Sequence, residues 1–401
     1  MIMIKIHVPF SKLKEAVQYH WNWIKRKFYI DVDYNSLNTN EKIKWTKAHK
    51  ELNELYELLH FTGLSDEEKK LQLKKLICVF PKNLENISKS DEFEHLVMNK
   101  SSGYYTWKKA TKKLEKINKS NPKYNLLNEF VEFGKILYKK EINSDRVLQL
   151  LDYESLYDDP NWNAYKLCEK LDISVCPYCN RNYVFVTRNV DGKFLTRPQL
   201  DHFFVKSKYP FLSCSFFNLI PSCPFCNTEK NDNDKSTIYP YLEEFGDNAV
   251  FQMNSENVED ILKTKYISFD MKYNIEIKQV YSEKEKSEKK VQGEDIDLFV
   301  KKIVNSDEVF HLSPLYKEHQ LELKDLLLRY INTRGSNLGK YAKVYYEKDL
   351  KDIDSFQKEE LKKFLLGFPI SITEKKFEYP LRKFKEDIVK QLDDKSLNEE
   401  I

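Results

Sequence analysis

The sequence predicts a mainly α-helical protein with a small central α+β unit that four cysteines brace. Three observations support this fold class. The chain of 401 residues has only nine Gly among many Lys, Glu and Leu residues, which favours helices with few tight turns. Apolar residues recur three and four positions apart in the N-terminal and C-terminal parts. Two Cys-x-x-Cys pairs lie between these helical parts.

The N-terminal region, expected over 1–165, is mostly helical in its pattern. Residues 2–8 alternate weakly and could form a strand, whereas 41–61 and 125–141 show the helical spacing of apolar residues. The C-terminal region, expected over 246–401, has a less uniform pattern.

The first part of 246–401 is mixed, with candidate strands at 249–253 and 266–271. The remainder again has the helical pattern, most clearly over 319–331. Long helical regions on both sides of a small central unit are good material for docking a partner protein.

The central region, expected over 166–245, has a different composition. Residues 176–245 hold six of the 13 Pro and are rich in Asn and aromatic residues, so loops and turns should dominate there. The segment 187–196 has a turn at Val190-Asp191-Gly192 between two runs that favour strands, which predicts a β-hairpin.

Charge and hydropathy exclude few functions. Lys and Arg number 66 against 63 Asp and Glu, and this balance neither requires nor excludes nucleic acid, because a local basic patch can lie within a neutral total. The chain contains no run of 18 apolar residues and starts without a secretion signal, so we expect a cytoplasmic protein with no membrane partner. Seven Cys in that compartment are metal ligands or buried thiols rather than disulfides.

The two Cys-x-x-Cys pairs are near-duplicates, CPYCN and CPFCN. Cys176 and Cys179 form the first pair, and Cys223 and Cys226 form the second. A redox dithiol needs one such pair at the start of a helix in a βαβ unit, and no βαβ pattern surrounds Cys176. Two pairs supply the four soft ligands of a tetrahedral zinc ion, so we expect a structural Zn²⁺.

The insert between the two pairs contains three further polar signals. Asp201 and His202 are adjacent, Asn218 lies 16 residues after His202, and Asn227 follows the last Cys directly. Taken singly, each is most simply a turn or a cap residue, but their order between two zinc-type pairs is specific.

At this point the sequence resembles the HNH endonucleases, whose ββα-metal element is often braced by a four-cysteine zinc site. The resemblance rests on LDHFF, SFFNLIPSC and CNTEK and covers about 176–235. It is most similar to the HNH subunits of Septu-type and retron-linked anti-phage systems. Val205 stands where the family often has Pro, a departure that changes no ligand.

The resemblance implies a central ββα-metal unit and hydrolysis of phosphodiester bonds. His202 would be the general base, since an ordinary imidazole accepts a proton near neutral pH. Asp201 and Asn227 would give two hard oxygen ligands to a catalytic Mg²⁺ or Mn²⁺. Asn218 matches the family's middle Asn, which ties the hairpin loop together and holds the base.

Basic residues around the motif suggest where nucleic acid binds. Lys230, Arg181, Lys206 and Lys208 are the candidates, and such side chains position the backbone without reading bases. We expect DNA as the substrate, with RNA as the alternative. Both stay open, because hydrolysis by water does not depend on the 2′-OH.

Control by ATP would need another protein, because no nucleotide-binding motif is present. The segment 335–341, GSNLGKY, has three residues between its glycines and no Ser or Thr after the Lys, so it fails as a P-loop. The resemblance implies an ABC-type or SMC-like ATPase partner and a role as the effector nuclease of an anti-phage system. Two other functions stay open: a non-catalytic zinc-braced nucleic-acid-binding module, and a thiol oxidoreductase.

Overall fold

The structure is a computed structural model, and it divides the chain into two compact units. It describes residues 3, 5–59, 61, 63–78, 144–207, 209–233, 235–254, 266–273, 292–333 and 379–398. Unit 1 consists of Met1–Ile4, Ser174–Tyr183 and Glu244–Ile401, and unit 2 consists of Lys5–Ile173 and Val184–Glu243. The described chain is mainly helical and holds three two-stranded antiparallel sheets.

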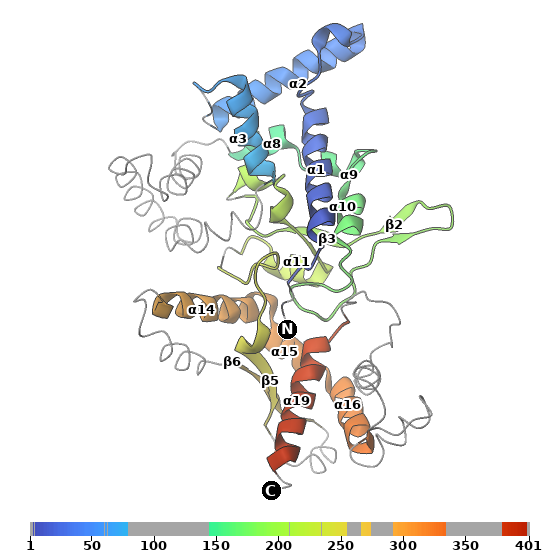
Figure 1. The fold of residues 1–401 in the computed structure, drawn as a ribbon, viewed down its shortest axis with the longest axis vertical. Helices are drawn as coiled ribbons and strands as arrows, with labels where there is room; N and C mark the ends of the chain where they lie inside the picture. Colours follow the sequence, from blue (N-terminus) through green and yellow to red (C-terminus); the bar gives the residue numbers. More distant parts are fainter. Residues whose placement is uncertain are drawn as a thin grey trace. The chain divides into compact units, whose positions relative to one another are not determined.

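Unit 2 contains the N-terminal helices and most of the central region (Figure 1). Its elements are α1 (Phe10–Lys27), the 3₁₀ turn η1 (Tyr34–Ser36), α2 (Thr39–Leu58), α3 (Asp66–Cys78), α8 (Ser144–Leu151), α9 (Ser155–Asp158), α10 (Ala164–Leu171), β1 (Thr187–Arg188), β2 (Phe194–Thr196), β3 (Gln199–His202), the 3₁₀ turns η2 (Pro210–Leu212) and η3 (Phe216–Asn218), β4 (Leu219–Ser222) and α11 (Pro224–Lys230).

Unit 1 contains most of the C-terminal region. Its elements are the 3₁₀ turn η4 (Gly246–Asn248), β5 (Ala249–Met253), β6 (Phe269–Tyr273), α14 (Gln292–Phe310), α15 (Leu312–Lys317), α16 (Gln320–Thr333) and α19 (Arg382–Asn398). None of the described helices in either unit is both long enough and apolar enough to span a membrane.

These units differ from the three consecutive regions that the sequence predicts. In unit 2 the N-terminal helices share a core with the central residues: α3 and α8 pack on the turn η2, and α3 also packs on η3. The apolar faces of these helices are buried against the central loops. The N-terminal helices and these loops therefore belong to one compact unit.

The helix α1 explains how this core is built. It begins directly after Pro9, and its buried residues recur along one face, from Ala16 and Val17 to His20 and Ile24. That face packs against α10 and α3. The fully buried Trp23 adds a large apolar side chain to the same core.

The helix α2 confirms the helical pattern expected over 41–61. It starts at a capping box, in which the Asn38 side chain accepts from the Glu41 amide at 2.9 Å and the Glu41 carboxylate accepts from the Asn38 amide at 3.0 Å. The pattern at 125–141 lies outside the described residues. The strand expected over 2–8 is wrong over residues 5–8, where the chain is irregular.

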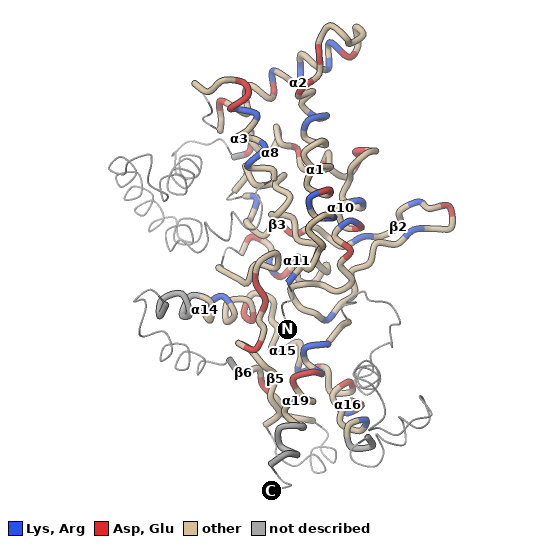
Figure 2. The backbone as a smooth tube through the Cα atoms, in the orientation of Figure 1, with Lys and Arg blue, Asp and Glu red and all other residues tan. Residues whose placement is uncertain are grey.

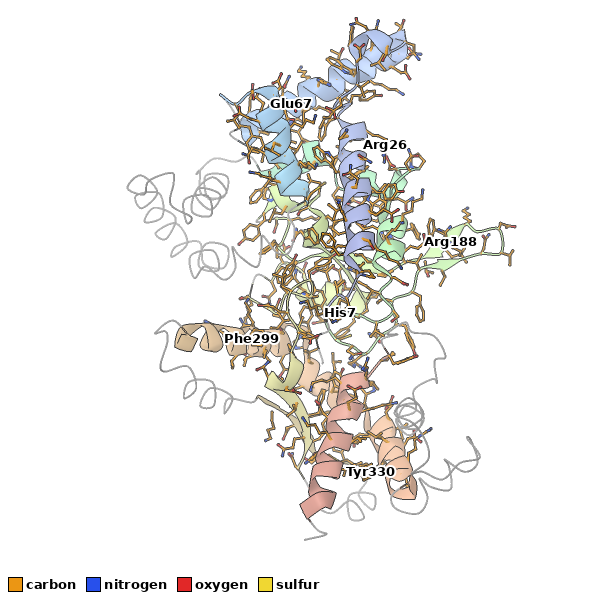
Figure 3. The ribbon with its side chains drawn as sticks, viewed as in Figure 1. His7, Arg26, Glu67, Arg188, Phe299 and Tyr330 are labelled. Carbon is orange, nitrogen blue, oxygen red and sulfur yellow. The ribbon has the colours of Figure 1, made fainter. Side chains whose placement is uncertain are left out.

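The hairpin predicted over 187–196 is confirmed. Strands β1 and β2 pair antiparallel, and Gly192 takes a positive φ of 79° in the turn, where a Cβ would be strained. Arg188, labelled on this hairpin in Figure 3, lies over the Phe194 ring and binds Glu169 of α10. The hairpin carries basic strands and an acidic tip (Figure 2).

Unit 1 confirms the two strands expected at its start. Strands β5 and β6 pair antiparallel over 249–253 and 269–273, and the helix expected over 319–331 is α16. Aromatic rings form the core beside this sheet: Phe251 lies 5.0 Å from Phe384 of α19 and 4.5 Å from Tyr316 of α15, measured between ring centroids. Such packing supports the small sheet, which would be marginal alone.

Candidate metal centre and candidate active site

The four cysteines predicted as zinc ligands lie together. The sulfur atoms of Cys176, Cys179, Cys223 and Cys226 are all within 4.8 Å of one another, and each residue is buried. Zn–S bonds of about 2.3 Å in a tetrahedron place the sulfurs about 3.8 Å apart, so this cluster has the size that one ion needs. The cluster could therefore hold a metal ion such as zinc.

The first pair is held by a tight turn of its own. The Asn180 amide donates to the Cys176 carbonyl, and the Cys176 amide donates to the Asn182 carbonyl, both at 2.9 Å. Asn180 takes the left-handed conformation, with φ at 47°, which Asn tolerates better than most residues. The Asn after the second Cys of CPYCN is thus explained by the backbone of the turn.

The second pair opens the helix α11. Cys223 is the N-cap residue, and Pro224 at the first helical position supplies a φ suited to the helix start. Cys226 lies on the first turn, and the Asn227 amide donates to the Cys223 carbonyl at 3.1 Å. Two of the four thiols are therefore fixed at the beginning of the helix that follows β4.

The remaining cysteines are buried thiols, as the sequence predicts. Burial raises the pKa of Cys78, Cys168 and Cys214 to about 12, so these thiols are protonated at neutral pH. Cys176 and Cys179 are also fully buried, whereas the oxidoreductase hypothesis requires them to be exposed to solvent. Burial therefore counts against that hypothesis.

The residues predicted for catalysis lie on a hairpin followed by a helix. Strands β3 and β4 pair antiparallel, with Asp201 opposite Ile220 and His202 opposite Leu219, and α11 follows and packs on β3. The order of elements is β, β, α, and it brings Asp201, His202, Asn218 and Asn227 into one small part of unit 2.

Asp201 is buried in an ion pair with Lys230. The Lys230 ammonium lies 3.1 Å from Oδ1 of Asp201 and 2.6 Å from the main-chain oxygen of His202, and both side chains are at most 5 % exposed. The pair joins β3 to α11. It also places a positive charge directly beside the carboxylate that is predicted to bind a divalent ion.

Asn227 lies three residues before Lys230 on α11 and also contacts β3. Its side-chain amide nitrogen donates to Oε1 of Gln199 at 2.8 Å. Gln199 and Asp201 are two residues apart on β3 and so project from the same face. The side chains of Asp201 and Asn227 therefore both belong to the interface between α11 and β3.

The imidazole of His202 has a different environment. Nε2 lies 2.9 Å from the carbonyl oxygen of Ser213, and the Tyr153 ring packs edge-on against the imidazole at 4.6 Å. A carbonyl only accepts, so Nε2 carries the hydrogen and donates it. In the part of the chain that the structure describes, no hydrogen bond engages Nδ1 of His202.

Electrostatics keeps His202 neutral. Desolvation lowers the pKa of the imidazole to about 4, and the positive charges of Lys206 and Lys230 act in the same direction, while the bond to Ser213 opposes them. The ring is therefore unprotonated at pH 7, with the Nδ1 lone pair available as a base.

Asn218 ties the hairpin loop together, as the resemblance implies. Its side-chain oxygen accepts from the Phe204 amide at 2.6 Å, and its side-chain nitrogen donates to the carbonyls of Phe204 and Leu212 at 3.0 Å. The Asn218 carbonyl also accepts from the Phe203 amide. This buried side chain fixes the backbone that follows His202.

The residues predicted to contact nucleic acid lie in different environments. Lys206 is exposed near His202, as a contact to a phosphate requires. Arg181 is half-buried, and its Nε donates to Nε2 of His319 at 2.9 Å. Lys208 lies outside the described residues.

The expectation for Lys230 is corrected. The sequence places it on a helix where it could meet a phosphate, but its ammonium is buried and bonded to Asp201 and His202. The helix α11 turns this side chain toward β3, where the carboxylate offsets the cost of burying a charge.

Sequence reasoning missed the groups that orient the predicted base. Tyr153 comes from the loop after α8, and Ser213 contributes only its main-chain carbonyl, so no residue type could have signalled it. Gln199 lies two residues before Asp201, and in a strand this even spacing puts both side chains on one face, which is the one signal that the sequence offers for Gln199.

Comparisons with known proteins identify no relative of this chain. No protein-family model, no curated protein and no solved structure matches this chain.

Proposed function

We propose that this chain is a metal-dependent HNH endonuclease that hydrolyses phosphodiester bonds of nucleic acid. The observation that carries the proposal is the arrangement of β3, β4 and α11. It supplies a neutral imidazole at the end of one strand, a carboxylate beside it and an Asn on the following helix, next to a four-cysteine cluster.

His202 would act as the general base. Its Nε2–H is committed to the Ser213 carbonyl, so the proton from water would be taken up at Nδ1. The lowered pKa ensures that the base is unprotonated over the whole neutral range. A fixed hydrogen bond on the other nitrogen also holds the ring in one orientation, which favours proton transfer at a defined atom.

Asp201 and Asn227 would hold the catalytic ion. Their oxygens are hard ligands, and Asn227 directs its amide nitrogen to Gln199, which reserves its oxygen for another partner. A bound Mg²⁺ or Mn²⁺ would neutralise charge on the scissile phosphate and assist the leaving oxygen. Lys230 competes for the Asp201 carboxylate, so ion binding would have to rearrange this pair.

The proposed substrate is a nucleic acid, and the proposed partner is an ATPase. Lys206 offers a positive charge beside the base, which suits a phosphate backbone of either DNA or RNA, and DNA is our first expectation. We also propose an anti-phage role under control of an ABC-type or SMC-like ATPase. This part rests on the resemblance over 176–235 alone.

Cleavage assays test the proposal. The purified chain, with and without its genomic neighbour, is incubated with plasmid DNA and total RNA in Mg²⁺ or Mn²⁺, and with a chelator as the blank. Cleavage should require the metal and should disappear in His202→Ala. His49→Ala is the matched control, because His49 also directs Nε2 at a main-chain carbonyl, that of Tyr29, but lies on α2.

One observation favours a non-catalytic nucleic-acid-binding module instead. The Asp201 carboxylate is already paired with a buried ammonium, as expected for a residue with a structural role. This alternative predicts binding of nucleic acid without cleavage under every metal condition. If the parent chain cleaves nucleic acid and the His202→Ala variant cleaves it at the same rate, our assignment of His202 as the general base is wrong.

A further inference from the structure

Two histidines from distant parts of unit 2 bind neighbouring carbonyls of the same loop. His202 donates from Nε2 to Ser213, and His20 of α1 lies with Nε2 2.9 Å from the carbonyl oxygen of Cys214. Among the described residues, no backbone amide donates to either oxygen. Both imidazoles therefore help to fix the two carbonyl groups of the Ser213–Cys214 segment.

His20 has both of its ring nitrogens engaged. The indole Nε1–H of Trp162 donates to Nδ1 at 3.0 Å, and the Cys214 carbonyl accepts from Nε2. Indole only donates and carbonyl only accepts, so a neutral Nε2–H imidazole is the one form that satisfies both neighbours. His20 is fully buried, and desolvation keeps it neutral by lowering its pKa to about 4.

The loop has additional anchors that transmit this constraint. The Ser213 amide donates to the Pro210 carbonyl and the Ser215 amide donates to the Leu212 carbonyl, which makes two overlapping tight turns over 210–213 and 212–215, and the second turn contains Cys214. The Cys214 sulfur lies 3.5 Å from the Leu151 carbonyl at the end of α8. A rigid loop of this kind passes a shift at Cys214 directly to the adjacent Ser213 carbonyl, since the two oxygens belong to consecutive residues.

We propose that His20 is a positioning residue for His202. By fixing the Cys214 carbonyl, it holds the Ser213 carbonyl where it selects the Nε2–H form of His202 and leaves Nδ1 as the base. The effect on His202 follows from the contacts alone, whereas its consequence for cleavage rests on the proposed nuclease function. His20 on α1 thus acts on His202 through the main chain of residues 213–214, which lie far from His20 in the sequence.

A spectroscopic experiment tests the positioning directly. The full chain is labelled with ¹⁵N in its histidine rings, and the Nδ1 and Nε2 shifts of His202, assigned with His202→Gln, report its tautomer. The parent should show the Nε2–H form. His20→Phe removes the donor to Cys214 while keeping an aromatic ring, and it should produce a mixture of tautomers at His202.

Two further variants separate positioning from mere folding. His20→Gln retains a donor near the Nε2 position and should restore the parent tautomer in large part. His49→Phe is the matched control and should leave His202 unchanged, because the Tyr29 carbonyl that His49 contacts belongs to another loop. Should His20→Phe fail to fold, Trp162→Phe replaces it, since loss of the indole donor removes what fixes the form of His20.

Cleavage kinetics supply the second readout. For His20→Phe we expect kcat to fall by roughly 10- to 100-fold with KM nearly unchanged, because misplacing a catalytic group costs rate rather than binding. A folded His20→Phe chain with the parent tautomer at His202 would overturn the inference. An inactive parent chain would instead overturn the proposed function, and the tautomer measurement would still decide the role of His20.

Discussion

His20 and His202 show how two similar contacts give a histidine different roles. Both donate from Nε2 to a carbonyl of the loop 213–214 at 2.9 Å, and burial lowers the pKa of both to about 4. Nδ1 of His20 accepts a hydrogen bond from Trp162, whereas Nδ1 of His202 has no such bond among the described residues. The second nitrogen therefore separates a bracing histidine from one that can accept a proton.

The position of each ring in the fold explains this difference. His20 lies on the buried face of α1 among Trp23, Trp162 and Phe216, so every polar atom must find a partner there. His202 is the last residue of the short strand β3 and is half-buried. The ring within the core therefore has a partner at each nitrogen, whereas the ring at the end of β3 has a partner only at Nε2 among the described residues.

The largest loss of stability is expected from Cys223→Ser, which removes one ligand of the candidate metal centre beside the strand pair that carries His202. Structural zinc contributes about 10–16 kcal/mol of apparent binding free energy to folding, so loss of one thiolate should unfold the segment that carries β4 and α11. Zinc content and thermal unfolding measure the effect. Cys168→Ala is the control, because this buried thiol lies outside the cluster. A Cys223→Ser chain that keeps zinc and parent stability would contradict the metal centre.

The next effect is expected from His202→Ala. Loss of a general base should lower kcat by about 10²- to 10⁴-fold, while zinc content should stay at the parent level because His202 is not one of the four clustered cysteines. Rates of plasmid or RNA cleavage measure the loss. If a substitution at His20 reduced cleavage more than His202→Ala, the assignment of the two roles would have to be reversed.

A third effect tests what holds the strand that carries His202. Lys230→Met leaves the Asp201 carboxylate buried without its partner, which should lower the free energy of unfolding by about 3–5 kcal/mol. Lys170→Met breaks the solvent-exposed pair with Glu15 and should lower the free energy of unfolding far less. Urea unfolding of both variants checks this order. Equal losses would show that the Asp201–Lys230 pair is not effectively buried.

The smallest effect concerns pH and His20. Its pKa is about 4 in the folded chain and near 6.5 when unfolded, so the unfolded chain binds more protons between these values. Stability is fully retained above pH 6.5 and falls as pH decreases toward 4, by about 3 kcal/mol from this group. Urea unfolding between pH 7 and pH 4.5 should show a smaller decrease in His20→Phe. An unchanged pH dependence would mean that His20 is not held neutral.

The sequence alone determined the features that depend on local spacing. Two Cys-x-x-Cys turns place two thiols each, so their duplication was enough to predict the four-cysteine cluster. The Val190–Gly192 turn likewise predicted the hairpin, because turn chemistry acts over a few residues. Helical periodicity located α2 and α16 for the same reason.

Only the tertiary structure decided which groups hold the candidate base. The carbonyls of Ser213 and Cys214 have no sequence signature, and Trp162 lies 142 residues from His20. Lys230 was expected at the surface, yet the packing of α11 on β3 buries it against Asp201. Spacing fixes what a short segment can present, whereas the partner of each polar group depends on how distant segments pack to exclude water.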